Sequence, residues 1–204
     1  MDIKDTYLTI DLPSEGIFKD KGSKFLAFAY PLTDESKVKN IVQNLKKEHH
    51  SARHHCFAFK IGNQGEQYRA NDDGEPSGTA GRPILGQLNS YNLTNILVVV
   101  VRYFGGTLLG VGGLINAYKN ATIEALENAS IVEKIIETHY QLRFDYPLQN
   151  TVMKVLKDFN TDITNSQFEM DCRLSIAVRL SNEEAVINIL NKIDGLSLSK
   201  IEKH

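Results

Sequence analysis

The most apolar stretch of the chain is Ile96 to Val101, which holds only branched aliphatic side chains. Such a run is too uniform for a strand with one face in water, and its β-branched residues disfavour a helix. It therefore predicts a strand buried on both faces. Beyond a run of glycines, apolar residues return at three- and four-residue spacing from Leu114 to Leu126, which predicts a helix.

The glycines between this strand and this helix are the first candidate binding residues. They are Gly105, Gly106, Gly110, Gly112 and Gly113. A strand, a glycine segment and a helix direct backbone N–H groups and the positive end of a helix dipole to one point, which suits an anion or a phosphate. A tight turn that packs the helix on the strand explains the glycines equally, and on either interpretation we expect Gly112 and Gly113 to tolerate no side chain. The spacing matches neither the dinucleotide nor the P-loop fingerprint.

The residues before Ile96 predict strands, two helices and a long polar loop, and the second helix carries Ile84, Leu85 and Leu88. Apolar alternation predicts strands at Tyr7–Ile10, Lys24–Tyr30 and His54–Ile61, and an amphipathic stripe predicts a helix from about Glu35 to His49. The sequence between Gly62 and Gly86 is polar and glycine-rich, which is typical of a functional loop.

The residues after the long helix have a different rhythm. Strand patterns at Tyr140–Tyr146, Asp162–Phe168, Leu174–Leu180 and Leu196–Ile201 alternate with helix patterns at Leu148–Phe159 and Ala185–Ile193. This order, βαββαβ, is that of the ferredoxin-like unit. The rhythm changes near Glu133 to Thr138, so we expect two domains, residues 1–135 and 136–204. The fold class is α/β (α+β).

Composition restricts the function less than the pattern does. The net charge of −2 excludes a strong basic field over the whole molecule. Cys56 and Cys172 are far apart without a CxxC motif, so neither a disulfide framework nor a zinc site is indicated, and the cytoplasm is the expected location. No apolar run approaches the roughly 18 residues of a membrane span.

Three acids crowd the polar loop at Asp72, Asp73 and Glu75. They can hold Mg²⁺ beside a phosphate. They can equally make the turn and cap hydrogen bonds that Asp favours before glycine, and the residues leave both interpretations open. We expect His54 or His55 to pair with a nearby acid rather than bind a metal, because His54, His55 and Cys56 are adjacent and neighbours in a strand point to opposite faces.

Cations near these segments complete the candidate site. Arg82 and Arg102 lie close in sequence to the glycine-rich segments, and Lys24 lies beside the predicted turn at residues 21–23. We expect the segments Asp72–Glu75 and Gly105–Gly113 to form one cleft at the ends of adjacent strands, where α/β proteins bind ligands. No complete set of nucleophile, base and orienting residue is evident, so the residues specify no reaction.

Four motifs of the chain resemble the signature of the YigZ/IMPACT family. Two are long, DDGEPSGTAGRPIL and VVVVRYFGGTLLGVGGLINAYKNA, and the other two are KGSKFLAFAYPL and ARHHCFAFKIG. The resemblance covers essentially the whole first domain. It implies a first domain similar to domain 2 of ribosomal protein S5, and a second domain like domain V of elongation factor G, as in the bacterial two-domain form. Eukaryotic relatives regulate translation under amino-acid stress, and they use an additional N-terminal domain to do so.

Two functions are therefore open. The resemblance implies a non-enzymatic, translation-linked protein that binds RNA, the ribosome or a translation factor. The alternative is an enzyme or binding protein for a phosphorylated small molecule or nucleotide, with the glycine and acidic loops as its site. No cofactor beyond Mg²⁺ is indicated, and the residues leave the oligomeric state open.

Overall fold

The computed structural model describes residues 5–201, which form two compact units. One consists of residues 7–134, and the other of residues 135–201 together with Asp5 and Thr6. None of the described helices is long and apolar enough to cross a membrane.

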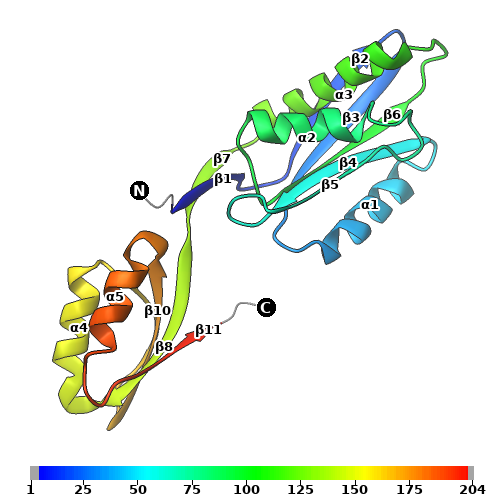
Figure 1. The fold of residues 1–204 in the computed structure, drawn as a ribbon. Helices are drawn as coiled ribbons and strands as arrows, with labels where there is room; N and C mark the ends of the chain where they lie inside the picture. The colour runs from blue at the N-terminus through cyan, green and yellow to red at the C-terminus, as the bar shows by residue number, and fades with distance from the viewer. Residues whose placement is uncertain (1–4, 202–204) are drawn as a thin grey trace. The chain divides into compact units, whose positions relative to one another are not determined.

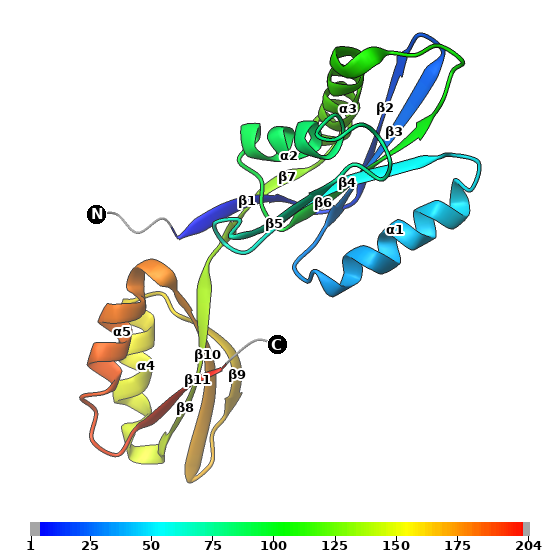
Figure 2. The same ribbon diagram turned by 45° about the vertical axis from the view of Figure 1, so that its right-hand side comes forward.

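The larger unit is a five-stranded antiparallel sheet between two helical layers (Figures 1 and 2). The strand order is β2-β3-β6-β4-β5, and β1 pairs with β7 in a separate two-stranded sheet. Helices α2 and α3 cover one face of the large sheet and α1 covers the other. The elements are β1 (Thr6–Ile10), β2 (Ser14–Asp20), β3 (Ser23–Pro31), α1 (Ser36–Glu48), β4 (His54–Ile61), β5 (Gln67–Asn71), α2 (Gly81–Ser90), β6 (Ile96–Tyr103), α3 (Gly110–Glu127) and β7 (Ile131–Ile135).

The central strand β6 explains why this sheet needs helices on both sides. Val98 and Val100 pack into the core beneath α2 and α3, whereas Val99 and Val101 pack into the core beneath α1. All four are 0% exposed. The prediction of a strand buried on both faces is confirmed, and burying apolar side chains on both faces is the main force that holds the layers together.

The smaller unit has the predicted βαββαβ order. Its sheet order is β11-β8-β10-β9, the antiparallel arrangement of a ferredoxin-like unit, with α4 and α5 packed into the same core cluster as β8 and β10. The predicted mixed α/β fold class is confirmed. The elements are β8 (Glu137–Asp145), the 3-10 turn η1 (Tyr146–Leu148), α4 (Gln149–Asp158), β9 (Asp162–Gln167), β10 (Asp171–Arg179), the 3-10 turn η2 (Leu180–Asn182), α5 (Glu183–Leu190) and β11 (Ser197–Ile201).

The sequence pattern does not predict two strands of the larger unit. In β2, Gly16 reads as the end of a strand, but a β-carbon there would overlap the backbone nitrogen of Ala125, so this glycine lets β2 lie against α3. The second strand, β5, falls inside the expected polar loop, and its residues Gln67 to Ala70 are all exposed. Its polar sequence, QYRAN, lacks the apolar alternation that predicts a strand.

The glycine segment differs from the expectation in where the helix begins. Helix α3 starts at Gly110, so Gly112 and Gly113 are in its first turns. A β-carbon on Gly105 would overlap the carbonyl carbon of Gly22, so this glycine lets the chain after β6 lie against the β2–β3 turn. A β-carbon on Gly112 would meet nothing within 4 Å, which argues against the expected crowding there, whereas one on Gly113 would meet Leu109 Cβ at 3.0 Å.

We predict opposite effects for two alanine substitutions in this segment. Gly105→Ala should lower the free energy of unfolding by about 1–3 kcal/mol, because the methyl group overlaps the β2–β3 turn. Gly112→Ala should raise it by about 0.5–1 kcal/mol, because alanine favours a helix and the position is open. Urea unfolding of both variants measures the two values, and a destabilised Gly112→Ala would contradict the structural assignment.

Candidate functional site

A buried ion pair lies at the centre of the larger unit. The guanidinium Nη1 of Arg102, near the end of β6, is 2.7 Å from Oε1 of Glu75. The Tyr118 hydroxyl of α3 donates to the same oxygen at 2.8 Å. Glu75 and Arg102 are 8% and 6% exposed and Tyr118 is fully buried. Three segments far apart in sequence are therefore joined at one carboxylate.

Aromatic rings enclose the cation of this pair. The guanidinium carbon of Arg102 lies 5.6 Å from the ring centres of both Phe25 and Phe104. These contacts stabilise a charge that has little access to water. The buried Nε of Arg102 has no hydrogen-bond partner among the described residues.

Asp72 caps the start of α2. Its Oδ1 accepts hydrogen bonds from the backbone N–H groups of Ala80 and Gly81 at 3.1 and 2.8 Å, and its Oδ2 accepts from that of Gly78 at 2.8 Å. Burial alone would raise the pKa of Asp72, but these three donors outweigh burial and hold the pKa below its usual value. Asp72 thus satisfies backbone donors that the end of a helix leaves open.

Asp73 fastens the same loop to β4 and α1. Its carboxylate accepts from the backbone N–H of His55 at 2.7 Å and from Nζ of Lys46 at 2.9 Å. Burial raises the pKa of Asp73, but Lys46 and the His55 N–H together lower it by more, and the net pKa is below the ordinary value. His54 Nδ1 is 2.9 Å from the backbone carbonyl oxygen of Asp73, so the imidazole ring of His54 forms a hydrogen bond with the backbone of the acidic loop and not with a carboxylate.

Burial and the nearby Lys46 lower the pKa of His55, although Asp73 acts in the opposite direction. The His55 ring is 3% exposed, and its Nε2 has no hydrogen-bond partner among the described residues. Its Nδ1 is 3.9 Å from Asp73 Oδ2. Because its pKa is below the ordinary value for histidine, His55 is mainly neutral at pH 7.

The structure unites some of the predicted site residues and separates others. Glu75 and Arg102 meet directly. The backbone N–H of Gly105 donates to the Ser23 hydroxyl, and Gly106 and Gly110 have φ of +85° and +71°. Arg82 is exposed beside Gly78, and Lys24 is exposed on β3. No hydrogen bond between the segments Asp72–Glu75 and Gly105–Gly113 is found among the described residues.

The chemistry of this cluster is structural. Burial raises the pKa of both the Cys56 thiol and the Tyr118 hydroxyl, so neither is an activated nucleophile or a base at neutral pH. The described residues contain no group of three or more His, Cys, Asp or Glu side chains placed to hold a metal ion. The carboxylates of Asp72, Asp73 and Glu75 each have protein partners instead.

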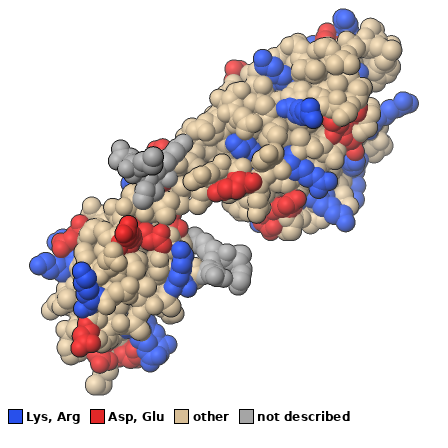
Figure 3. Space-filling model, viewed as in Figure 1, with Lys and Arg blue, Asp and Glu red and all other residues tan. Residues whose placement is uncertain are grey.

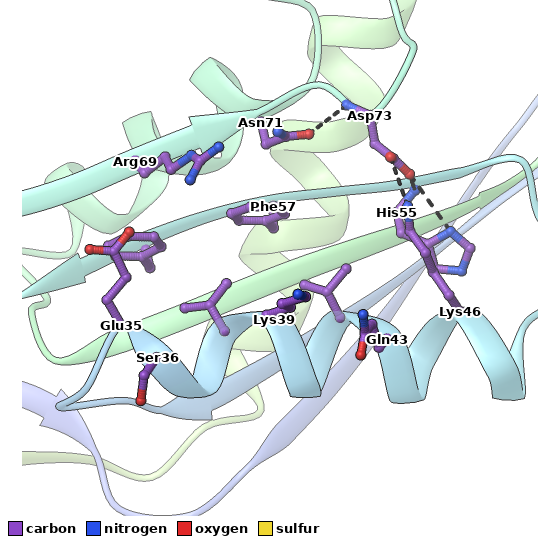
Figure 4. A pocket seen from close by; sticks show the side chains of 13 residues that line it. Glu35, Ser36, Lys39, Gln43, Lys46, His55, Phe57, Arg69, Asn71 and Asp73 are labelled. Atoms are coloured by element: carbon purple, nitrogen blue, oxygen red, sulfur yellow. Dashed lines mark hydrogen bonds and ion pairs between the residues drawn. The ribbon is translucent and has the colours of Figure 1, made fainter.

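A cleft of about 630 Å³ between α1 and the β4–β5 edge is a second candidate site, which sequence reasoning missed (Figure 4). Its volume is within the usual range of ligand pockets. Its two sides come from α1 and from strands that lie at the edge of the sheet. Its lining consists of Glu35, Ser36, Val38, Lys39, Val42, Gln43, Lys46, His55, Phe57, Phe59, Arg69, Asn71 and Asp73. The lysines of α1 were the only sequence signal for this cleft. Because the sequence pattern did not predict β5, the wall opposite α1 could not be placed.

The fold and these sites define a two-unit α/β protein with a structurally paired acidic loop and a separate surface cleft. The Impact N-terminal domain family matches residues 21–126. The IMPACT family member YigZ of Escherichia coli (strain K12) is 36% identical over 160 residues, or 78% of each chain. The chain belongs to the IMPACT family.

Two solved structures are similar to the chain. A crystal structure described as that of a hypothetical protein aligns with 99% of this chain and 100% of its own, with a TM-score of 0.70 and 31% identity. Yih1, described as a two-domain translational regulator, aligns over 60% of this chain and 47% of its own, with 26% identity and a TM-score of 0.36. A similarity of shape as low as that to Yih1 supports no conclusion.

Removing the central carboxylate should be costly. We predict that Glu75→Ala lowers the free energy of unfolding by about 3–5 kcal/mol, because Arg102 is left as a buried, uncompensated charge. The double variant Glu75→Leu with Arg102→Met should be less destabilised than Glu75→Ala, because it removes both charges. Urea unfolding tests this order of stability, and a double variant with a lower free energy of unfolding than Glu75→Ala would contradict it.

The cap at α2 predicts a pH-dependent effect. Because the folded pKa of Asp72 is below its unfolded value, its stabilisation is complete above that value and is lost as pH falls. We predict that Asp72→Asn costs about 1–2 kcal/mol at pH 7. The difference from the unchanged protein should shrink below about pH 4. Asp158→Asn, at an exposed position of α4, is the control. Urea titrations at several pH values measure the difference in the free energy of unfolding between each variant and the unchanged protein. A difference for Asp72→Asn that does not depend on pH would contradict the cap assignment.

Proposed function

We propose that this protein is a non-enzymatic, translation-linked protein that binds RNA, free or in the ribosome, through the lysine-bearing side of α1. The observation that carries the proposal is a set of unpaired cations. Lys37, Lys39 and Lys47 are exposed on α1, and none is within 4.0 Å of a carboxylate oxygen among the described residues, although Lys37 is close enough to Asp34 to help lower the pKa of that carboxyl. In Figure 3, lysine and arginine side chains lie over this helix.

Local charge supports this proposal better than total charge does. The chain as a whole is slightly acidic at −2, so its overall field gives no attraction for a polyanion. Binding to RNA depends instead on the phosphates that individual lysines and arginines contact, because each contact releases counterions. The exposed lysines of α1 offer such contacts on two sides of the helix, because Lys37 and Lys39, two residues apart, point in nearly opposite directions. Lys39 lines the cleft, whereas Lys37 and Lys47 lie outside its lining. Family resemblance supplies the link to translation.

The surface of the smaller unit is a weaker candidate. Two of its cations, Arg143 and Arg173, lie on the sheet and pair with Asp171 at 2.7 and 3.1 Å. Binding a phosphate there would require breaking these pairs. Lys154 and Lys157 of α4 are exposed like the lysines of α1, but neither lines the cleft, so they serve as the control. The enzyme alternative is also weaker, because the acidic loop and the buried tyrosine and thiol are held as neutral or internally paired groups. One observation still favours a nucleotide-binding role, namely the cleft beside α1.

RNA binding and its salt dependence test the proposal. We expect a fluorescein-labelled single-stranded RNA of 20 nucleotides to bind, and Lys37→Gln with Lys47→Gln to weaken binding about tenfold at 50 mM salt. The slope of log affinity against log salt should fall in size by about 0.7 for each RNA phosphate that a substituted lysine no longer neutralises. Fluorescence anisotropy across a salt series measures both effects.

The matched control removes the same charge elsewhere. Lys154→Gln with Lys157→Gln changes two exposed lysines of α4 and should leave the affinity unchanged. Cosedimentation with ribosomes, using the same variants, tests the ribosomal form of the target. Equal losses of affinity in both double variants, or no binding of RNA and ribosomes by the unchanged protein, would overturn the proposed function.

A further inference from the structure

The cleft beside α1 exists because the helix does not cover the whole sheet. The side chains of α1 pack into a core with β3, β6 and β4, whereas β5 takes no part in that core. Because β5 is the edge of the sheet, the space between it and α1 opens to solvent. Figure 4 shows this opening, with Arg69 and Asn71 of β5 above and Lys39 and Gln43 of α1 below.

The floor of the cleft is apolar and partly aromatic. Phe59 is 2% exposed and supports the floor from below, while Phe57 and Val42 are only half-buried and remain accessible. Figure 4 shows the Phe57 ring between the two walls. Flat, accessible aromatic surface is what unstacked nucleobases pack against in RNA-binding proteins.

The walls combine free amides with free cations. Asn71 accepts the Asp73 N–H through Oδ1, which leaves its Nδ2 as a donor, and Gln43 presents a whole amide from α1. Amide groups of this kind can hydrogen-bond the edge of a base. Lys39 and Arg69 have no ion-pair partner among the described residues, whereas Lys46 is paired with Asp73. The rim acid Glu35 offsets one of the two free cations, so a positive excess remains.

We propose that this cleft receives the base of an unpaired nucleotide and that Lys39 and Arg69 hold its flanking phosphates. The inference rests on the proposed function and makes it specific, because it names single-stranded RNA rather than duplex as the target. A base in a duplex is stacked and paired and cannot enter the cleft. Arg69 is the cross-strand partner of Phe59 in the β5–β4 register, so its side chain lies beside Phe59 on the same face of the sheet and brings its cation to the cleft.

A filling substitution tests the cleft separately from the charged face. Gln43→Trp places an indole at an exposed position of α1 that lines the cleft, and Asn44→Trp places the same group on the next exposed residue, which does not line it. We expect Gln43→Trp to weaken binding of a single-stranded RNA 10-mer at least tenfold, while Asn44→Trp leaves it within twofold. Binding of the duplex 10-mer should be unaffected by either variant. Thermal melts establish that both variants fold.

The outcomes separate this inference from the proposed function. If Lys37→Gln with Lys47→Gln weakens RNA binding but Gln43→Trp does not, the cleft inference fails and the proposed function stands. If no RNA binds, the proposed function fails, and titration with AMP and UMP followed by the backbone amide shifts of Gln43 and Asn71 decides the cleft. Shifts that Gln43→Trp abolishes support a nucleotide site, and the absence of shifts overturns the inference.

Discussion

The ion pair between Glu75 and Arg102 is the interaction on which the larger unit depends. A guanidinium that is 6% exposed must have a partner, because an uncompensated buried charge costs several kcal/mol. The only carboxylate within ion-pair distance of it among the described residues is Glu75, and the same oxygen accepts the Tyr118 hydroxyl. The acidic loop, the central strand and the long helix are therefore fixed relative to one another by a single carboxylate.

This constraint helps to explain why the acidic segment is so rich in carboxylates. Each acid has a different structural task. Glu75 neutralises Arg102, Asp72 caps α2, and Asp73 joins β4 to α1 through Lys46. Because the three carboxylates face different partners, they converge on no common point. The turn-and-cap interpretation of the sequence thus describes the arrangement of Asp72 and Asp73, while the pairing of Glu75 depends on contacts distant in sequence.

The sequence predicts most of the fold because elements with a buried face have apolar residues at regular spacing. The doubly buried β6 and most of the βαββαβ order of residues 137–201 follow from apolar spacing. The exception is β9, which was predicted from its alternation although all six of its residues are exposed. The strand β5 has no such signal, since its sequence QYRAN lacks apolar alternation. The cleft was missed for the same reason, because one of its walls is β5. The close approach of Gly16 to Ala125 is also invisible in sequence, since it depends on which helix lies above β2.

The contrast between two groups of cations separates structure from function in this protein. Arg102 is adjacent to the glycine segment and resembles a ligand-binding arginine in sequence, yet its charge is neutralised inside the protein. Lys39 and Arg69 attract no attention in sequence, yet they keep their charge at the mouth of a cleft. An external anion gains more from a cation without an internal partner, since no existing pair has to be broken. By this reasoning the proposed binding surface is located by unpaired charge beside accessible apolar area, and the internally bonded acidic loop belongs to the frame that holds it.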